Sequence, residues 1–476
     1  MAQHGNGRNG NDRRSLTSSS GTHVRYIKKA LLIAIPIMIQ NGITNIVGML
    51  DNVMVGRVGT DPMSGVAVVN EILFVWMLMI FGGLSGIGIF TAQYTGKGDT
   101  EGVRNTFRLQ ILVSLLITIA GIAVFLTRGE QLVSLFLTED TGIGNAEATL
   151  SFAMSYFKVM CLGLVPFAVT QAYAGTLRST GETVMPMTAS LIAVAVNLVG
   201  NYILIYGKMG APALGVVGAA AATVISRIVE LLCLALWTHL HAEKYRFVKG
   251  VYRSFHVPAA LIRSCAVKGM PLLLNETMWA GCSATLTQIY SVRGLSVIAA
   301  FNISRTISNV FNVAFIAMGS AIGIIIGQEL GAGGKSAEEV KKDAWILTWF
   351  SVGLCVISGG LLTLVSGAFP LIYNTSDEIR AMAVGLIRIS AVCMPLYAFE
   401  NASYFVIRSG GKTVVTFFFD SCFGWIFSIP AAWFLVHRTG LPILTLFFIV
   451  QMIEWIKCVI GFVLMKKGIW INDITV

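Results

Sequence analysis

The 476-residue chain is too apolar and too sparsely charged to be a soluble protein. Hydrophobic residues make up 55% of it and Asp, Glu, Lys and Arg only 12%, whereas soluble domains carry about 25% charged residues. The net charge of +10 does not indicate a nucleic-acid partner, because the basic residues lie in an amino-terminal segment and in short loops, as the positive-inside rule requires.

Long apolar stretches begin only after residue 28. Residues 1–28 are polar, basic and rich in Gly and Ser, and we expect a disordered cytoplasmic tail there. Stretches of about 20 apolar residues, enough to cross a bilayer, then recur almost to the end. We therefore predict an all-α integral membrane protein with twelve transmembrane helices, at 29–55, 70–94, 105–127, 152–177, 184–206, 215–239, 266–292, 300–329, 343–372, 382–407, 413–436 and 443–465.

An internal repeat divides these helices into two halves. When Pro36 is aligned with Pro271, further pairs coincide without a gap, among them Gln93 with Gln328 and Gly96 with Gly331. Each repeat holds six predicted helices, an even number, so both enter the membrane from the same side and are related by a pseudo-two-fold axis along the membrane normal. We expect an amino-terminal lobe (29–240), a cytoplasmic linker (241–264) and a carboxy-terminal lobe (265–476).

The distribution of Lys and Arg predicts the orientation. If both termini are cytoplasmic, the inner segments hold most of the basic residues, including the linker sequence AEKYRFVKGVYR. The outer loops then hold only Arg57, Arg128, Lys208, Arg293 and Arg438. This asymmetry favours a multi-pass protein of the cell membrane with both termini inside.

No catalytic pattern emerges. The segment GQELGAGGKS (327–336) resembles a phosphate-binding loop, but Glu329 stands where that pattern needs Gly, and the segment follows a predicted helix, not a strand. The histidines lie in the tail, in loops or at the ends of predicted helices. We therefore expect neither an enzyme nor a bound cofactor or metal.

Four carboxylates lie inside apolar stretches, where an acidic residue is costly and indicates function. Asp51 comes five residues before Gly56, about 8 Å below the outer end of the first helix. Glu276, Glu400 and Asp420 are each eight residues from a basic residue at the inner end of their helix, so all three lie about 12 Å deep.

These depths predict that Glu276, Glu400 and Asp420 meet in one polar site that binds a cation or shares a proton. The alternative is three separately hydrogen-bonded acids that tie helices together. Two further acid–base pairs, Arg227 with Glu230 and Glu454 with Lys457, are spaced i, i+3. We interpret them as structural pairs that neutralise themselves on one helix face.

Several motifs resemble those of one transporter family. DNVMVGRVG (51–59), GIGIFTAQYTGKGD (86–99) and LRSTGETVMP (177–186) are the first three, and NLVGNYILIYG, GVVGAAAATVISR and NETMWAGCSATLTQIYSVRG follow them. Together they make residues 30–465 similar to the multidrug and toxic compound extrusion (MATE) transporters. The resemblance implies two six-helix lobes around a V-shaped cleft, and extrusion of organic, often cationic compounds in exchange for sodium or protons.

The resemblance also implies roles for particular residues. Asp51 matches the acidic residue of the family's first helix, Glu276 the glutamate of its seventh helix, and Glu400 the acid of its tenth. Asp420 is assigned from its depth alone. In one branch of the family, a polar network of the amino-terminal lobe contains a second aspartate, and this chain has Asn201 at that position. We expect a substrate or cation network that comprises Asn41, Asn197, Asn201, Thr223 and Tyr397.

The leading hypothesis is thus a monomeric antiporter, coupled to Na⁺ or H⁺, that exports small organic molecules by alternating access; we expect these molecules to be cationic. The runner-up is a flippase for lipid-linked saccharides, which shares the broad fold. A flippase would favour many cationic residues lining the cleft to hold phosphates, whereas acids are at least as prominent in these helices.

Overall fold

The computed structural model describes residues 11–137 and 145–475, and this part of the chain is helical and without β-strands. Ten of its helices are long and apolar enough to cross a membrane, and one bent pair forms a further crossing. The helix α8, at Ala259–Ser291, completes the twelve. It is less apolar than the others because Arg263, Lys268 and Glu276 lie on it.

The amino-terminal lobe contains six crossings. The fourth is the bent pair, which turns by 47° where α4 meets α5. Gly163 separates the two helices and Pro166, which lacks a backbone N–H, follows at once, so the hydrogen-bond ladder is interrupted there. The helices are α1 (Asn11–Gly56), α2 (Thr60–Lys97), α3 (Thr100–Ser134), α4 (Ala146–Leu162), α5 (Leu164–Ser179), α6 (Val184–Tyr206) and α7 (Val216–Leu240).

The carboxy-terminal lobe repeats this plan. Its fifth crossing is a single rod made of α12 (Thr413–Phe417), two π-helical stretches (Phe418–Cys422 and Gly424–Ser428) and α13 (Ile429–Arg438). A short 3₁₀ turn, Phe369–Ile372, precedes α11. The other helices are α8, α9 (Leu295–Ala332), α10 (Ala337–Val365), α11 (Asp377–Ser409) and α14 (Ile443–Lys467).

The segment before residue 29 differs from the expected disordered tail. Residues 1–10 lie outside the described residues, but α1 begins at Asn11, so 11–28 is helical. Contacts with the carboxy-terminal lobe hold this helical start: the Tyr26 hydroxyl meets the Lys335 ammonium, and Lys29 Nζ donates to Gln328 Oε1 at 3.2 Å. Composition alone predicts disorder because it does not show the tertiary contacts that this segment makes with the other lobe.

The linker between the lobes is shorter than predicted, 241–258, because α8 begins at Ala259. Two 3₁₀ turns, Arg246–Val248 and Val251–Arg253, dock it onto α3. Arg108 donates to the carbonyl oxygen of Val251 at 2.9 Å, and the rings of Phe247 and Phe107 pack edge to face. The linker is therefore part of the folded structure.

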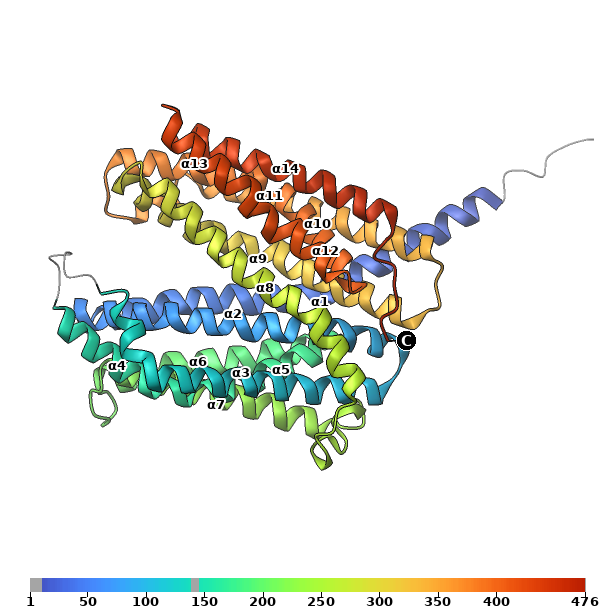
Figure 1. Ribbon diagram of the computed structural model, residues 1–476, viewed down its shortest axis with the longest axis horizontal. Coiled ribbons are helices and arrows are strands. Elements are labelled where there is room, and N and C mark those ends of the chain that lie inside the picture. Colours follow the sequence, from blue (N-terminus) through green and yellow to red (C-terminus); the bar gives the residue numbers. More distant parts are fainter. Residues whose placement is uncertain (1–10, 138–144, 476) are drawn as a thin grey trace, which may run out of the picture.

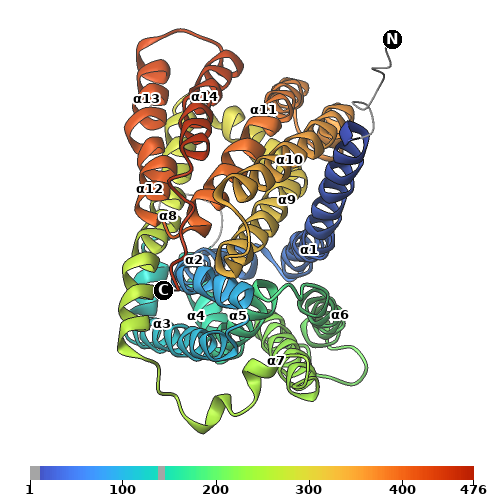
Figure 2. The same cartoon turned by 90° about the vertical axis from the view of Figure 1, so that its right-hand side faces the viewer.

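The two lobes lie side by side and touch along a narrow seam (Figures 1 and 2). Helix α2 packs against α8 and α9 of the other lobe, and α1 packs against α9. Near one end of the molecule α2 and α9 cross so closely that a Cβ at Gly96 would lie 1.8 Å from the Gln328 carbonyl oxygen. A Cβ at Gly331 would lie 1.9 Å from the Gln93 carbonyl oxygen, which is the same contact with the lobes exchanged. This reciprocity is the local signature of a two-fold relation.

Hydrogen bonds repeat the same symmetry at this crossing. Gln93 Nε2 donates to the carbonyl oxygen of Ser409 at 2.9 Å, and Gln328 Nε2 donates to that of Ser179 at 2.9 Å. Each glutamine thus binds the last residue of a helix in the opposite lobe. We call these two contacts the glutamine latches.

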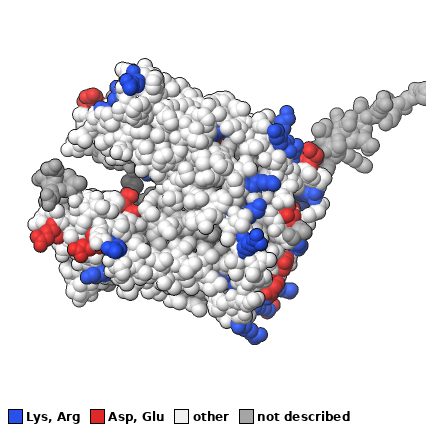
Figure 3. Space-filling model, in the orientation of Figure 1, with Lys and Arg blue, Asp and Glu red and all other residues white. Residues whose placement is uncertain are grey.

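Charged side chains lie at both ends of the molecule, and Lys and Arg are denser at one of them (Figure 3). Lys and Arg gather at the end where α2 meets α3, α9 meets α10 and the chain terminates, while the middle of this face is nearly free of charge. Large apolar side chains such as Leu116 and Ile119 are exposed there, as a surface that faces lipid requires. At the opposite end the lobes part and leave a hollow between them (Figure 3).

Candidate coupling and substrate sites

The amino-terminal lobe holds a polar site around Asp51 of α1. Asn201 of α6 donates from Nδ2 to Asp51 Oδ1 at 2.7 Å and to Asn197 Oδ1 at 3.2 Å. Asn197 in turn lies 3.2 Å from the Thr223 hydroxyl of α7. Asn197 and Asn201 share one face of α6 because they are one turn apart. The structure therefore brings Asp51, Asn197, Asn201 and Thr223 together.

The amide of Asn197 is best oriented with its nitrogen toward the carboxylate. It then donates to Asp51 Oδ1 at 3.0 Å, and its oxygen accepts from Thr223 Oγ1 at 3.2 Å, so the bond from Asn201 to Asn197 Oδ1 is replaced. Both asparagines then donate hydrogen bonds to the negatively charged Asp51 carboxylate. Within the described residues no cationic side chain forms an ion pair with Asp51, so its charge is solvated only by neutral dipoles.

Asn41 is not part of this site. It lies on α1 ten residues before Asp51, about 15 Å along the helix. Among the described residues no hydrogen bond joins it to Asp51.

The pairing of Arg227 with Glu230 is also not found: Arg227 lies over the Phe167 ring, 5.0 Å from its centroid, and no ion pair joins it to Glu230 in the part of the chain that the structure describes. The i, i+3 spacing permits that pair, but packing against Phe167 draws the guanidinium aside.

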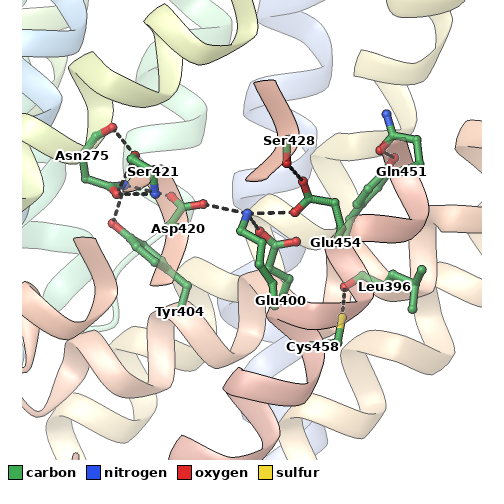
Figure 4. A network of polar contacts seen from close by, with 12 residues as sticks. Asn275, Leu396, Glu400, Tyr404, Asp420, Ser421, Ser428, Gln451, Glu454 and Cys458 are labelled. Carbon is green, nitrogen blue, oxygen red and sulfur yellow. Dashed lines mark hydrogen bonds and ion pairs between the residues drawn. The ribbon is translucent and has the colours of Figure 1, made fainter. Parts of the chain in front are cut away.

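The carboxy-terminal lobe holds a second polar site, centred on Lys457 of α14 (Figure 4). Its ammonium contacts Glu400 of α11, Asp420 Oδ1 at 3.2 Å and Glu454 Oε2 at 3.0 Å. We call these four residues the lysine cluster. The Lys457 side chain is 8% exposed and the three carboxylate side chains 15–19%.

Neutral side chains surround the lysine cluster. Asn275 of α8 donates to Asp420 Oδ2 at 2.9 Å, and Ser428 donates to Glu454 Oε1 at 3.1 Å. Tyr397, which the sequence assigns to a substrate or cation network, donates instead to Gln451 Oε1 at 2.6 Å. Tyr397 thus lies beside the cluster and not on Lys457.

The π-helical stretches explain the position of Asp420. A π-turn adds a residue to each turn and rotates the side chains that follow it, and such turns are frequent at functional sites. Asp420 lies in the first stretch and Ser428 ends the second, and both point toward partners on neighbouring helices. Sequence periodicity could not predict that the helix forms π-turns here.

Glu276 does not join the lysine cluster as predicted. Asn275, the residue before it, faces Asp420, and neighbouring residues on a helix point in different directions. The Glu276 side chain faces α2 of the other lobe, where its Cγ would lie 3.5 Å from a Cβ at Gly82. Among the described residues, no hydrogen bond or ion pair reaches its carboxylate. Glu400 and Asp420 do meet, but through an ammonium.

Sequence reasoning does not find Lys457 as the centre of the site, because the i, i+3 spacing of Glu454 and Lys457 indicates a self-contained pair. That pair does form. The depth argument could have found the rest: Lys457 lies nine residues before Lys466, about 14 Å from the inner end of α14 and close to the depth of Glu400 and Asp420.

A cavity of about 180 Å³ lies between the lobes. It is lined by α2, α3 and α5 on one side and by α9 and α11 on the other, with serines and glutamines among apolar residues. Arg178 and Arg408, which occupy equivalent places in the two repeats, both line it. The guanidinium of Arg408 packs on Phe405, 4.9 Å from the ring centroid.

A bundle of two symmetric helical lobes, with a cavity between them and acids buried within each, defines a secondary transporter. Comparisons with known proteins agree. The model of the MatE family matches residues 36–203 and 271–434, one segment in each lobe. The chain belongs to this family of multidrug and toxic compound extrusion transporters, and it is not an enzyme.

Among its relatives are the multidrug resistance protein MdtK of Photorhabdus laumondii and the probable multidrug resistance protein NorM of Thermotoga maritima. Each is 24% identical, and the alignments cover 86% and 88% of this chain and 88% of each relative. Similar solved structures include an outward-facing multidrug resistance MATE transporter (18% identity, TM-score 0.81) and a MOP superfamily transporter from Pyrococcus furiosus (19%, 0.80). Both alignments cover 92% of this chain and 95% of the other, and both show the shared fold.

Proposed function

We propose that this protein is a cation-coupled antiporter that exports organic, cationic or neutral compounds across the cell membrane by alternating access. One observation carries the proposal: Asp51 is a half-buried carboxylate with neutral donors, and it has no cationic partner among the described residues. Its charge is costly there unless a cation or a proton joins it. A site that gains stability from binding an ion can couple that ion to a change of lobe conformation.

Glu276 supports the same proposal from the other lobe. Its Cγ approaches α2 across the seam, and its carboxylate forms no ion pair in the described part of the chain, so it too can attract a cation or a cationic substrate. The acid faces the boundary between the lobes, where alternating access requires contacts that change. We propose Asp51 and Glu276 as the two coupling residues.

The orientation is part of the proposal. The basic end would face the cytoplasm, with both termini there, and the hollow would then face outward. In that arrangement the glutamine latches close the cytoplasmic side. One chain contains both lobes and the cavity, so we propose that the monomer is the transporting unit.

Export of organic compounds rests on the names of the relatives, which are multidrug resistance proteins. A second candidate, transport of an anionic lipid-linked saccharide, is favoured by Arg178 and Arg408 in the cavity, since guanidinium groups bind phosphates. It is the weaker candidate, because the half-buried acids Asp51 and Glu276 would repel such a substrate.

Purified protein in liposomes tests the proposal. A pH gradient and a sodium gradient are imposed separately, and the efflux of a fluorescent organic cation is recorded beside the translocation of a fluorescent lipid-linked phosphate. We expect one of the two gradients to drive the organic cation. Translocation of the lipid phosphate without any gradient, with no movement of the organic cation, would favour the flippase.

A further inference from the structure

The lysine cluster suggests an ion preference for the carboxy-terminal lobe. Three carboxylates on three separate segments, α11, the π-helical stretch and α14, converge on one point in the apolar interior. Oxygen atoms converging in this way are the ligands that a hard cation such as sodium prefers. The point where they converge is already taken by the ammonium of Lys457.

We infer that Lys457 is a tethered cation that occupies the ion position of the carboxy-terminal lobe and prevents sodium from binding there. The role in transport rests on the proposed antiport, whereas the exclusion of sodium can be tested without transport. Under this inference, sodium or proton coupling in this chain runs through Asp51 and Glu276 and not through Glu400 and Asp420.

The geometry leaves no room for a second cation. Lys457 donates hydrogen bonds to Glu400 and Asp420, and its ammonium also lies 3.0 Å from Glu454 Oε2, so it occupies the point where the three carboxylates converge. A sodium ion that shared these oxygens would lie within a few ångström of the ammonium, in a medium of low dielectric constant that strengthens their repulsion.

The charge balance keeps the ammonium in place. Three carboxylates face one ammonium, so the cluster carries excess negative charge when all its members are ionised. The Lys457 side chain is 8% exposed and reaches the site from α14, so the polypeptide chain itself holds the ammonium beside its partners. A mobile ion would exchange with water, whereas the tether holds this cation in the site permanently.

Neutral donors bind outer oxygen atoms of the lysine cluster. Asn275 and Ser428 donate to the outer oxygen atoms of Asp420 and Glu454, so those oxygens do not point toward a vacant space. Asp51 in the other lobe differs in this respect, because its donors are all neutral amides. The two lobes therefore share a fold but not a site chemistry.

Sodium binding to purified protein tests the inference. All variants carry Asp51→Asn and Glu276→Gln, which remove both proposed coupling acids from the measurement. Equilibrium binding of radioactive sodium is then compared among this background, Lys457→Ala and Lys457→Arg, with choline chloride holding the ionic strength constant. We expect sodium binding only in Lys457→Ala, because Lys457→Arg retains a tethered charge.

A second readout guards against loss of folding. Removing Lys457 leaves three carboxylates without a cation, so Lys457→Ala should be destabilised in choline and stabilised when sodium replaces it, with no such rise in the background. Should Lys457→Ala not fold, Lys457→Ala with Glu454→Gln removes one of the negative charges and is measured in its place.

Two results would overturn the inference. One is sodium binding to the background with Asp51→Asn and Glu276→Gln that Glu400→Gln abolishes, since sodium would then share the site with Lys457. The other is a folded Lys457→Ala protein, or its double variant, that binds no sodium, since the ammonium would then not stand in an ion position. Failure of both gradients to drive transport would overturn the proposed antiport and leave these binding results unaffected.

Discussion

Asp51 and Lys457 are both charged residues within apolar helices, and their surroundings differ in kind. Asp51 is surrounded by amide donors that solvate its charge without cancelling it. Lys457 is surrounded by carboxylates that cancel its charge and add more. A carboxylate with only neutral donors gains free energy when a mobile ion binds. The carboxylates around Lys457 already hold a cation that is part of the chain.

Substitution of Asp51 therefore affects transport more than folding. We expect Asp51→Asn to lower gradient-driven export by on the order of tenfold or more, because a neutral amide has no charge with which to bind an ion. Efflux from liposomes measures it, with the thermal unfolding midpoint recorded in parallel. Glu130→Gln, at an exposed carboxylate of α3, is the matched control. Normal transport by Asp51→Asn would show that Asp51 is only structural.

Substitution of Glu400 should mainly lower stability, whereas substitution of Glu276 should mainly lower transport. Glu400→Ala removes one partner of a buried ion cluster, and we expect a loss of about 1–3 kcal/mol of stability, below the range for an isolated buried pair because two carboxylates remain on Lys457. Glu276→Gln removes no ion pair, so we expect it to reduce transport with little change in stability. Unfolding midpoints and efflux rates of the two variants, measured together, check the contrast. Equal destabilisation by both would contradict it.

At the scale of helices, the crossing of α2 and α9 depends on two glycines. Gly96 and Gly331 allow each backbone to touch the carbonyl oxygen of the other lobe's latch glutamine. Even a methyl group would have to displace backbone atoms, which overpacks the contact. The latches and the glycines lie within one turn of each other, so they act on the same seam.

We expect Gly331→Ala to push α2 and α9 apart and to reduce transport, at a cost of about 1–3 kcal/mol from overpacking. The control is Gly334→Ala, a glycine in the α9–α10 connection that has nothing within 4 Å of an added Cβ. Efflux and unfolding midpoints of the two variants are compared. If both behave alike, the close crossing has no special role.

At the scale of the whole molecule, the carboxy-terminal residues tie the two lobes together. After α14 the chain returns to the seam, where Gln93 donates to the Asn472 carbonyl oxygen at 3.1 Å and accepts from the Ile474 N–H at 2.8 Å. Trp470 is fully buried against the end of α11. We call this segment, which follows α14 and lies beside the glutamine latches, the strap.

Removal of the strap should loosen the closed end. We expect truncation after Ile471, which keeps Trp470, to increase the rate at which a thiol reagent applied from the strap side labels Ser85→Cys in the central cavity. The physical reason is that Gln93 loses two of its three partners. Full-length Ser85→Cys is the reference, and the truncated parent without Ser85→Cys corrects for native cysteines. Unchanged labelling would show that the latches hold without the strap.

Orientation in the membrane is a further prediction at this scale. In intact cells, an impermeant thiol reagent should label Glu130→Cys at the end that carries the hollow and not Lys249→Cys in the linker. The basis is the concentration of Lys and Arg at the linker end. Labelling of Lys249→Cys alone would reverse the orientation.

The sequence by itself determined the membrane class, the helices, the repeat and the family, because these follow from hydropathy, from composition and from motifs along the chain. It also indicated Asp51 with Asn197, Asn201 and Thr223, since family motifs carry that group together. Which neighbour on a helix faces a site was decided only by tertiary structure: Asn275 faces Asp420 and Glu276 faces α2, a rotation that depends on how α8 packs.

The centre of the carboxy-terminal site was likewise decided by packing. Lys457 and Glu454 satisfy a local pairing rule, and that rule hides the approach of α11 and the π-helical stretch, which bring Glu400 and Asp420 to the same ammonium. Depth along a helix can be counted from the sequence, whereas direction around the helix depends on turn geometry and on neighbouring helices. A charge inside a membrane is therefore visible in the sequence, but its partner is settled only when the helices come together.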